Sequence, residues 1–289
     1  MHSIQLLVHH LPHLSRHVLP YIAALKFRSY ADQSGYKHDA EQALRVAGLG
    51  SSRVLRRVVS LRSRFMAEQM FITYAKPVDL LEMTPNIIDG DRNYLAVRQQ
   101  IAIGRPILFG CSYFGCMFYA LLAMKGLVKD LLVVTASDPA PGLHLFEKIA
   151  IASGIRIAVV GANEHVVALK ILRQLRRGAS VATMLDCFYG NHSDICTNFL
   201  GRPATSLGTL YRLGQSANAF VVPTASIYRD GRQELDVGEL VDLQTQSIDA
   251  ASQRINDYFS NLARVYPDQW MGWQNLWMRW NKANLSEAM

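Results

Sequence analysis

Short apolar runs alternate with amphipathic helical patterns between residues 106 and 228, and this alternation constrains the fold more than any other feature. Glycine, proline or polar residues bound each apolar run, which is typical of a buried strand. We predict strands at 106–111, 131–135, 155–160, 179–185 and 219–228. The helices expected between and before them are 93–103, 116–125, 142–153 and 165–177. The pattern predicts an α/β fold with a mixed, mainly parallel central sheet flanked by helices.

The first part of the chain has a different pattern. Residues 40–47 and 54–75 carry apolar side chains at three- and four-residue spacing, and Gly48 and Gly50 interrupt them. A chain of 289 residues can bury a large core as one domain. We therefore expect a single domain over 1–289, with a helical lead over 1–85 and an α/β core over 86–289.

The composition limits the location and the partners of the protein. No run reaches the ~18 uninterrupted apolar residues of a spanning helix, and the stretch 6–25 is broken by histidines and prolines, so it also makes a poor signal peptide. We expect a cytoplasmic protein, either soluble or peripherally bound at the inner face of the membrane. The cysteines form no Cys-x-x-Cys pair, so we expect no structural zinc and no other metal site.

Basic residues exceed acidic ones, with a formal net charge of +7. Arg53, Arg56 and Arg57 fall on one helical face, and Arg173, Arg176 and Arg177 form a second group. Such groups suit anionic lipid head groups or an acidic acyl carrier protein, and a solvated helix face is an equally good interpretation. No aromatic side chains are interleaved with these arginines, so nucleic acid is a poor candidate.

Ligands of such sheets bind outside the carboxyl ends of the strands. This rule places residues 111–115, Asp138 and residues 186–192 at one rim. A cysteine or serine at a strand-to-helix turn can act as a covalent nucleophile, and the candidates are Cys111, Ser112 and Cys116. Burial as packing residues is the more common role of cysteines beside apolar strands.

The loop after the fourth strand contains the best acid–base set in the sequence. His192 is followed by Asp194, and Asp186 ends the preceding strand, so either carboxylate could orient the imidazole. A solvated polar loop is the alternative, and it is the more common one. If His192 is the base, its replacement by alanine should cost about a hundredfold in rate or more. We interpret His144 and His165, on predicted helices, as structural.

Several blocks of sequence occur in a familiar order. They are 107–118 (ILFGCSYFGCMF), 173–186 (RQLRRGASVATMLD), 198–204 (NFLGRPA), 210–223 and 266–280, which contains Tyr-Pro-Asp-Gln-Trp. In this order they resemble the lipid A late acyltransferases of the lysophospholipid acyltransferase superfamily. The resemblance covers most of the chain from about residue 94 to residue 280. It implies an α/β fold and transfer of an acyl group from a thioester.

The chain departs from the pattern that the resemblance implies. The family has a catalytic histidine and an orienting acid at the positions that align with Tyr113 and Phe118. The Arg-Pro of the family reads Ser-Asp-Pro at 137–139, and the usual membrane-anchoring helix is missing from the N-terminal part. Arg202 matches a residue that the resemblance implies to contact an anionic substrate, although a salt bridge is an equal alternative. We expect substrate contacts from Tyr113, Gly115, Phe118, Gly201 and Arg202.

Three functions remain open. The first is an acyltransferase that moves an acyl group from a carrier-protein or coenzyme A thioester to a hydroxyl or amine by a non-standard acid–base set. The acceptor would be a small molecule or a carrier-bound intermediate, and no cofactor is expected. The second is a catalytically inactive homologue that binds acyl chains or a partner enzyme. The third is a thioester hydrolase that uses a cysteine or serine.

Four tryptophans recur at the end of the chain, at positions 270, 273, 277 and 280. This spacing would place them on one narrow face of a helix. Such a stripe could lie at a bilayer interface, but packing against the sheet is the more common role, and we expect it here.

Overall fold

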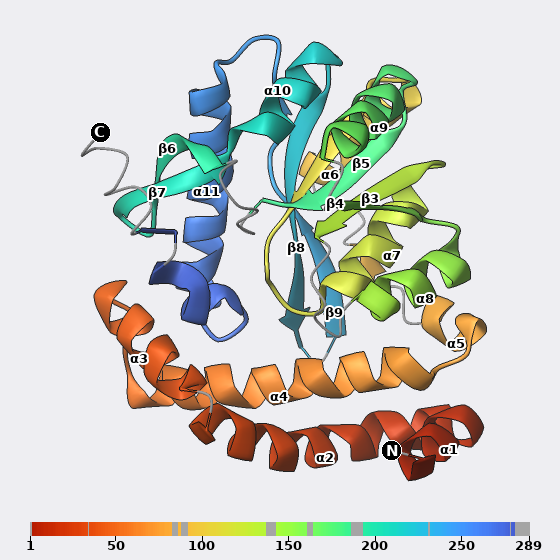
Figure 1. Cartoon of the computed structure of the whole chain (residues 1–289), viewed down its shortest axis with the longest axis vertical. Coiled ribbons are helices and arrows are strands. Elements are labelled where there is room, and N and C mark those ends of the chain that lie inside the picture. The colour runs from red at the N-terminus through yellow and green to blue at the C-terminus, as the bar shows by residue number, and fades with distance from the viewer. Residues whose placement is uncertain are drawn as a thin grey trace.

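The computed structural model describes residues 2–33, 35–82, 86–87, 92–136, 143–160, 164–185, 193–230, 232–277 and 279–280. Its centre is a twisted sheet with helices on both faces, and a layer of N-terminal helices lies across one end (Figure 1). The predicted fold class is confirmed.

The described strands form an eight-stranded sheet with the order β1-β9-β8-β2-β5-β3-β4, in which β10 pairs with β8. Its strands are β1 (Asn86–Ile87), β2 (Ile107–Cys111), β3 (Leu131–Ala136), β4 (Arg156–Val160), β5 (Ser180–Met184), β8 (Phe220–Arg229), β9 (Arg232–Val237) and β10 (Val241–Asp242). Leu108 pairs with Val181 in the parallel register of β2 and β5, so the strands that the sequence places in one sheet do lie in one sheet. Every residue of β2 and β5 is buried, as expected for parallel strands covered on both faces.

Three antiparallel pairs among the described strands were not predicted, and one of them is the pairing of β10 with β8 given above. β8 continues into β9 through a hairpin, and β6 (Ser193–Phe199) pairs with β7 (Arg202–Leu207) in a separate two-stranded sheet. Leu200 and Gly201 connect β6 to β7 with φ angles of 52° and 83°. Two left-handed residues in a two-residue loop make a type I′ turn, and glycine at the second position lowers its strain.

The core consists of two clusters, one on each face of the sheet. One cluster combines side chains of α7 (Met117–Leu127) and α8 (Leu143–Ser153) with inward residues of β2 such as Phe109. The other combines α9 (Glu164–Arg176), α10 (Gly208–Ser216) and α11 (Ile248–Val265) with residues such as Leu108. The chain therefore leaves β2 toward one face and, beyond β5, reaches the opposite face at α10. Where the segments that follow two neighbouring strands leave toward opposite faces of the sheet, a crevice suited to a ligand forms at the carboxyl ends of these strands.

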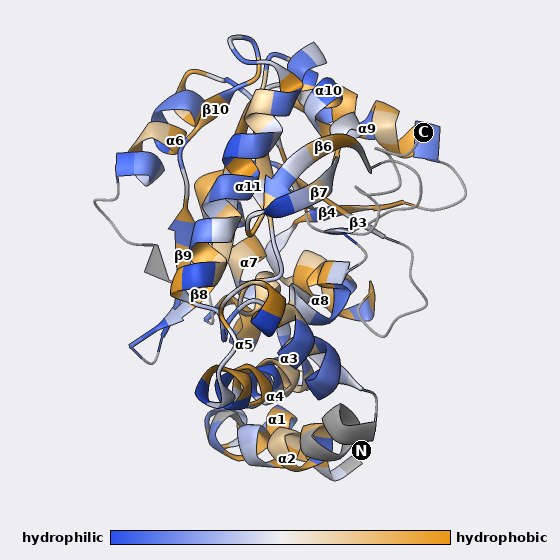
Figure 2. Cartoon of the chain, turned by 90° about the vertical axis from the view of Figure 1, so that its left-hand side faces the viewer, coloured by the Kyte–Doolittle hydropathy of each residue, from blue (hydrophilic) through white to orange (hydrophobic). Residues whose placement is uncertain are grey.

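The helical lead predicted for the N-terminal part is confirmed. It contains α1 (His2–His10), α2 (Pro12–Gln33), α3 (Tyr36–Val46), α4 (Ser52–Tyr74) and α5 (Pro77–Leu81). α4 lies between α2 and the sheet, and it passes the lower ends of β8 and β9 (Figure 1). Figure 2 shows these helices gathered at one end of the molecule, each with mixed polar and apolar surfaces. None of the described helices is both long and apolar enough to cross a membrane.

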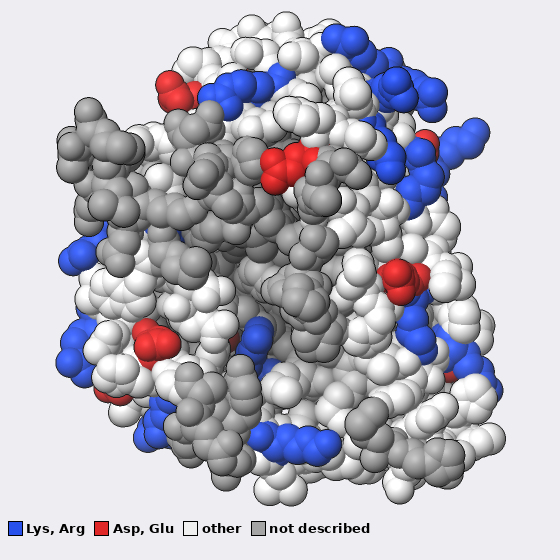
Figure 3. Space-filling model, viewed as in Figure 1, with Lys and Arg blue, Asp and Glu red and all other residues white. Residues whose placement is uncertain are grey.

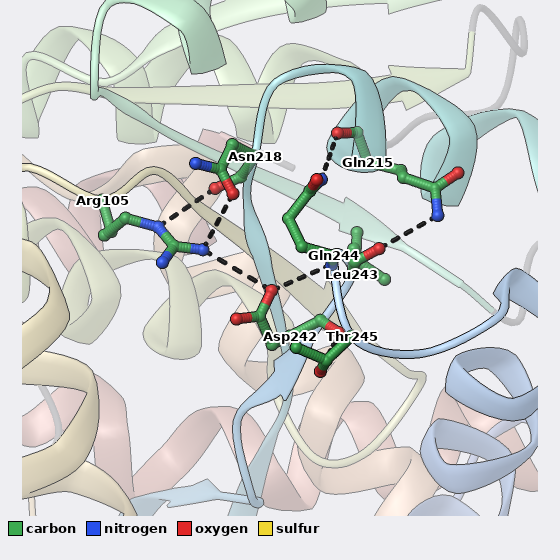
Figure 4. A network of polar contacts seen from close by, with 7 residues as sticks. All are labelled: Arg105, Gln215, Asn218, Asp242, Leu243, Gln244 and Thr245. Atoms are coloured by element: carbon green, nitrogen blue, oxygen red, sulfur yellow. Dashed lines mark hydrogen bonds and ion pairs between the residues drawn. The ribbon is translucent and has the colours of Figure 1, made fainter.

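The predicted helix over 93–103 is α6 (Arg92–Ala102), which leads into β2. At this amino end of the strand, the Arg105 guanidinium donates to the backbone oxygen of Asn218 at 3.2 Å and approaches the carboxylate of Asp242 at 3.5 Å (Figure 4). Gln215 and Gln244 connect the same loops by hydrogen bonds to backbone oxygens. This network fixes the end of the sheet remote from the predicted rim, so we assign it a structural role.

The tryptophan stripe is not one α-helix. Trp273 belongs to the 3-10 helix η1 (Gly272–Asn275), while Trp270 precedes it in an isolated bridge to Phe114. The single-helix prediction was wrong because Trp270 forms a β-bridge with Phe114 before η1 begins at Gly272. Trp270, Trp273 and Trp280 are buried, so the packing interpretation holds for them.

Candidate functional site

The turn from β2 to α7 lies at the carboxyl end of the central strand. Trp270 holds this turn, because its indole N–H donates to the hydroxyl oxygen of Ser112 at 3.2 Å and its ring packs on Phe114. Trp270 also contacts Phe199 of β6, with ring centroids 5.2 Å apart. The closing Pro-x-x-Trp block thus connects the turn at residues 112–116 to the β6–β7 hairpin.

Gly115 is required by the geometry of this turn. Its φ angle is +51°, and a Cβ atom there would lie 2.2 Å from the backbone oxygen of Ser226. Its N–H donates to the backbone oxygen of Gln269 at 3.1 Å. In this structure the N–H of Gly115 is therefore directed at the protein rather than at a substrate carbonyl, and the glycine packs tightly against β8.

The candidate nucleophiles at the end of β2 lie inside the protein. Cys111 is buried, and its sulfur lies 3.5 Å from the hydroxyl of Thr224. Ser112 is also buried, and its hydroxyl accepts the bond from Trp270. These contacts are typical of side chains that stabilise a strand end.

The two positions of the altered motif differ in their surroundings. Tyr113 is 38% exposed at the rim, whereas Phe118 is 3% exposed on the first turn of α7. The ring of Phe118 packs edge to face on Phe146 of α8, with centroids 5.0 Å apart. An apolar contact thus occupies the position where the resemblance implies an acid.

A carboxylate that sequence reasoning missed lies beside this turn. Glu68, on α4, faces the thiol of Cys116, and Gln233 Nε2 of β9 lies 3.4 Å from both of its oxygens. Arg64 Nε lies 3.8 Å away, and the Glu68 side chain is 15% exposed. Burial raises the pKa of Glu68 to about 7, against smaller lowering effects of Arg64, Gln233 and Cys116.

Cys116, next to Glu68, caps the amino end of α7 and is buried. Burial, together with the nearby Glu68 charge, raises the pKa of its thiol well above the ordinary value. A thiol with a raised pKa is a poor resting nucleophile, because the thiolate is the reactive form. Nothing in the local sequence indicates the pair, since Glu68 belongs to the helical lead and the two residues meet only through the fold.

The β6–β7 hairpin contains the two remaining residues predicted to contact substrate, Gly201 and Arg202. Gly201 occupies the turn, and the guanidinium of Arg202 lies over the ring of Trp280 at 5.2 Å from its centroid. Arg202 is exposed, so an anion can still approach it. The predicted acid–base set lies outside the described part: this applies to Asp186, His192 and the side chain of Asp194. Their roles stay predictions.

An apolar pocket of about 90 Å³ lies between α9, α10 and the carboxyl halves of β3, β4 and β5. Its lining is Val134, Val160, Glu164, Val167, Ala168, Ile171, Thr183, Leu207, Thr209, Leu210 and Leu213. The outer side of α9 is basic, since Lys170 and Arg173 are exposed there, and Arg177 is exposed directly after the helix. Figure 3 shows Lys and Arg side chains gathered over the upper right of this face, where α9 lies in Figure 1.

A mainly parallel central sheet flanked by helices defines an α/β protein. Residues 155–279 match the family model of the bacterial lipid A biosynthesis acyltransferases. The resemblance found in the sequence is confirmed over this segment, which includes both hairpins as well as Trp270, Trp273 and Trp277 and is acyltransferase-like. Tyr113, Phe118 and Glu68 precede it. No curated protein matches the chain. The described residues contain no group of His, Cys, Asp and Glu side chains that could hold a metal ion.

Proposed function

We propose that the protein transfers an acyl group from a thioester to a hydroxyl or amine acceptor without the histidine and acid of its family. The observation that carries this proposal is the family match over 155–279, joined through Trp270 to the turn at residues 112–116. Transfer needs an acceptor that loses its proton, donors for the developing oxyanion and a site for the acyl chain. The rim of β2 and β5 is where these requirements meet.

The donor we propose is an acyl carrier protein. The exposed Lys170 and Arg173 of α9, with Arg177 directly after it, would attract its acidic surface. The inner side of the same helix lines the apolar pocket, which suits an acyl chain. An acyl coenzyme A, whose phosphates are also anionic, would use the same charges.

We also propose peripheral contact with a membrane through α2. Leu14, Tyr21 and Leu25 are 50%, 76% and 74% exposed. At ~100° per residue they fall on one face of the helix. An apolar stripe of this kind can enter the boundary between head groups and acyl chains.

Intact-mass analysis tests the function. The chain is incubated with lauroyl-carrier protein or lauroyl-coenzyme A and with three acceptors: a monoacyl glycerophospholipid, a hydroxyacylated glucosamine disaccharide and an alkylamine. A gain of one lauroyl mass on an acceptor supports the proposal. Release of free laurate alone would favour a hydrolase instead.

The second candidate is an inactive homologue that binds acyl chains or a partner enzyme, and the apolar packing of Phe118 on Phe146 favours it. It predicts that lauroyl-carrier protein binds without any change of mass. A variant with Arg173 and Arg177 changed to Glu then separates carrier binding from catalysis. Loss of carrier binding with retained turnover of lauroyl-coenzyme A would identify α9 as the docking surface.

A further inference from the structure

Glu68 belongs to the helical lead, outside the α/β core, and its carboxylate lies beside the turn that follows β2. Its helix, α4, contacts the closing segment at several points, since Arg57 pairs with Asp268 at 2.7 Å and Arg62 approaches the sulfur of Met271 at 2.6 Å. Farther along the same helix, the guanidinium of Arg64 lies over the ring of Tyr228 at 3.7 Å. Glu68 follows one turn later, against Gln233 and Cys116. The helix is thus fixed along its length, and it positions this carboxylate beside the turn that carries the altered motif.

The Glu68 carboxylate is faced by Gln233, Arg64 and the thiol of Cys116, and its contacts with Gln233 and Arg64 are long. Gln233 approaches at 3.4 Å, and the nearest guanidinium nitrogen of Arg64 is 3.8 Å away. The group of Arg64 is engaged with the ring of Tyr228, and the amide oxygen of Gln233 accepts from Ser226 at 2.6 Å. A carboxylate held for stability alone is normally paired at shorter distances. A largely buried carboxylate with loose contacts is instead typical of a functional site.

We propose, on the basis of the proposed acyl transfer, that Glu68 is the general base that replaces the histidine and acid of the family. The oxygen of an acceptor hydroxyl attacks the thioester carbonyl carbon while the Glu68 carboxylate takes the hydroxyl proton. The new C–O bond forms, the C–S bond breaks, and Glu68 returns the proton to the leaving thiolate. The step balances with an ester and a free thiol as products, and it requires no further reactant.

The pKa of Glu68 fits this role. A general base is most effective when its pKa lies near the working pH, and burial raises the pKa of Glu68 to about 7. The groups that face it are Arg64 from its own helix, Gln233 from β9 and Cys116 from the start of α7. The raised pKa of the Cys116 thiol keeps it protonated at neutral pH, and arginine side chains in general stay charged over this range. The rise of rate with pH should therefore reflect Glu68 itself.

In this proposal Cys116 is a positioning residue that acts through Glu68. Its thiol faces the carboxylate and lowers the pKa of Glu68 slightly. Removing the thiol should raise the pKa of Glu68, so the rate profile of Cys116→Ala should move to higher pH, and Cys116→Ser should restore it. A merely structural cysteine would alter stability without moving the profile.

The test measures thiol release and acceptor acylation from lauroyl-coenzyme A between pH 5.5 and 8.5, with the three acceptors named above. Wild-type kcat should rise with an apparent pKa near 7, in line with the pKa of Glu68. Glu68→Gln should lower kcat about a hundredfold or more with little change in KM. Glu68→Asp should retain part of the activity, and Glu41→Gln, an exposed glutamate of α3, serves as the matched control. Thermal unfolding should show that Glu68→Gln is folded.

Two results would overturn the inference and leave the proposed function standing. The first is full activity in Glu68→Gln together with loss in His192→Ala, which would assign the base to the loop at residues 186–194. The second is a lauroyl adduct on Cys116 with no turnover in Cys116→Ala, which would establish covalent catalysis. A wild-type chain that acylates none of the acceptors contradicts the proposed function itself.

Discussion

The carboxylate of Glu68 faces the thiol of Cys116, so the helical lead contributes a charged group to the turn that follows the central strand. Each group alters the other. The charge of Glu68 raises the pKa of the thiol, and the thiol slightly lowers the pKa of the carboxylate. This pairing gives the lead a role beyond covering the sheet.

Stability should depend on pH through Glu68. Its folded pKa of about 7 lies above the ordinary value of 4.5, so the folded state binds more protons than the unfolded state between these two values. The free energy of unfolding should therefore fall as pH rises from about 4.5 to about 7, by on the order of 3 kcal/mol, and level off above that. Urea unfolding at pH 5 and pH 8 measures this change. In Glu68→Gln this contribution should vanish. If the difference in the free energy of unfolding between pH 5 and pH 8 is the same in the variant, the contribution belongs to other groups.

The turn at Gly115 should tolerate no side chain. In Gly115→Ala the new Cβ would meet the Ser226 oxygen at 2.2 Å, in a left-handed conformation with φ of +51°. We expect a loss of about 3 kcal/mol or more in the free energy of unfolding, from the clash and the backbone strain together. Gly201→Ala is the matched control, because its φ is +83° but nothing lies within 4 Å of the new Cβ. It should cost about 1 kcal/mol, and equal losses would contradict the steric argument.

Five strands of the sheet, β2, β3, β4, β5 and β8, were predictable because they are short apolar runs between strong breakers. Residues 107–111 and 180–184 are buried on both faces, and that environment leaves a local signature in the sequence. The β6–β7 hairpin was missed because its turn, Leu200-Gly201, lacks the Asn-Gly or Asp-Gly pair that identifies such loops. The β8–β9 hairpin was missed although the sequence contains such a pair, Asp230-Gly231, just after the predicted strand at 219–228. Glu68 was missed for a different reason. Its environment is made by three elements that are distant in sequence, so no local pattern can reveal its burial or its pKa.

The ion pair between Arg57 and Asp268 should connect the lead to the closing segment. The Asp268 side chain is only 4% exposed, and its Oδ2 lies 2.7 Å from Arg57 Nη2. Arg57→Leu removes the cation and leaves a buried carboxylate, which should cost about 1–3 kcal/mol, since Arg57 itself is largely exposed. Arg56→Leu, on an exposed neighbouring position, should change stability by less than about 0.5 kcal/mol. Chemical unfolding of the two variants compares them, and equal values would show that the pair contributes nothing.

Membrane contact through α2 should depend on its apolar stripe. Replacing Tyr21 and Leu25 by Asp adds two negative charges to a face that is 76% and 74% exposed at these positions. Cosedimentation with vesicles of phosphatidylglycerol and phosphatidylethanolamine should decrease at least tenfold, because buried apolar area is lost and anionic lipids repel the charges. Thermal stability should change little, since the side chains lie outside the core. Ile151→Asp, an exposed apolar position on α8, is the control. Equal loss of binding in both would contradict a role for the stripe.

Restoring the family pair at 113 and 118 should fail, and the reason lies in the surroundings of Phe118. Its ring is 3% exposed and packs on Phe146, so Phe118→Glu would bury a carboxylate in an apolar contact. We expect this change to cost on the order of 3–5 kcal/mol in the free energy of unfolding, from the lost packing and the unpaired charge.

The changes at position 113 should have smaller effects. Tyr113→His, at a 38% exposed position, should cost little stability. Tyr113→Phe should leave most of the activity, because a tyrosine with a pKa near ~10 is a poor base at neutral pH. Urea unfolding of the double variant, with Phe118→Leu as the apolar control, measures the cost, and lauroyl transfer measures any gain. A double variant that is as stable as the wild type and faster in transfer would mean that position 118 can still accommodate an acid, and that Glu68 is not needed as the base.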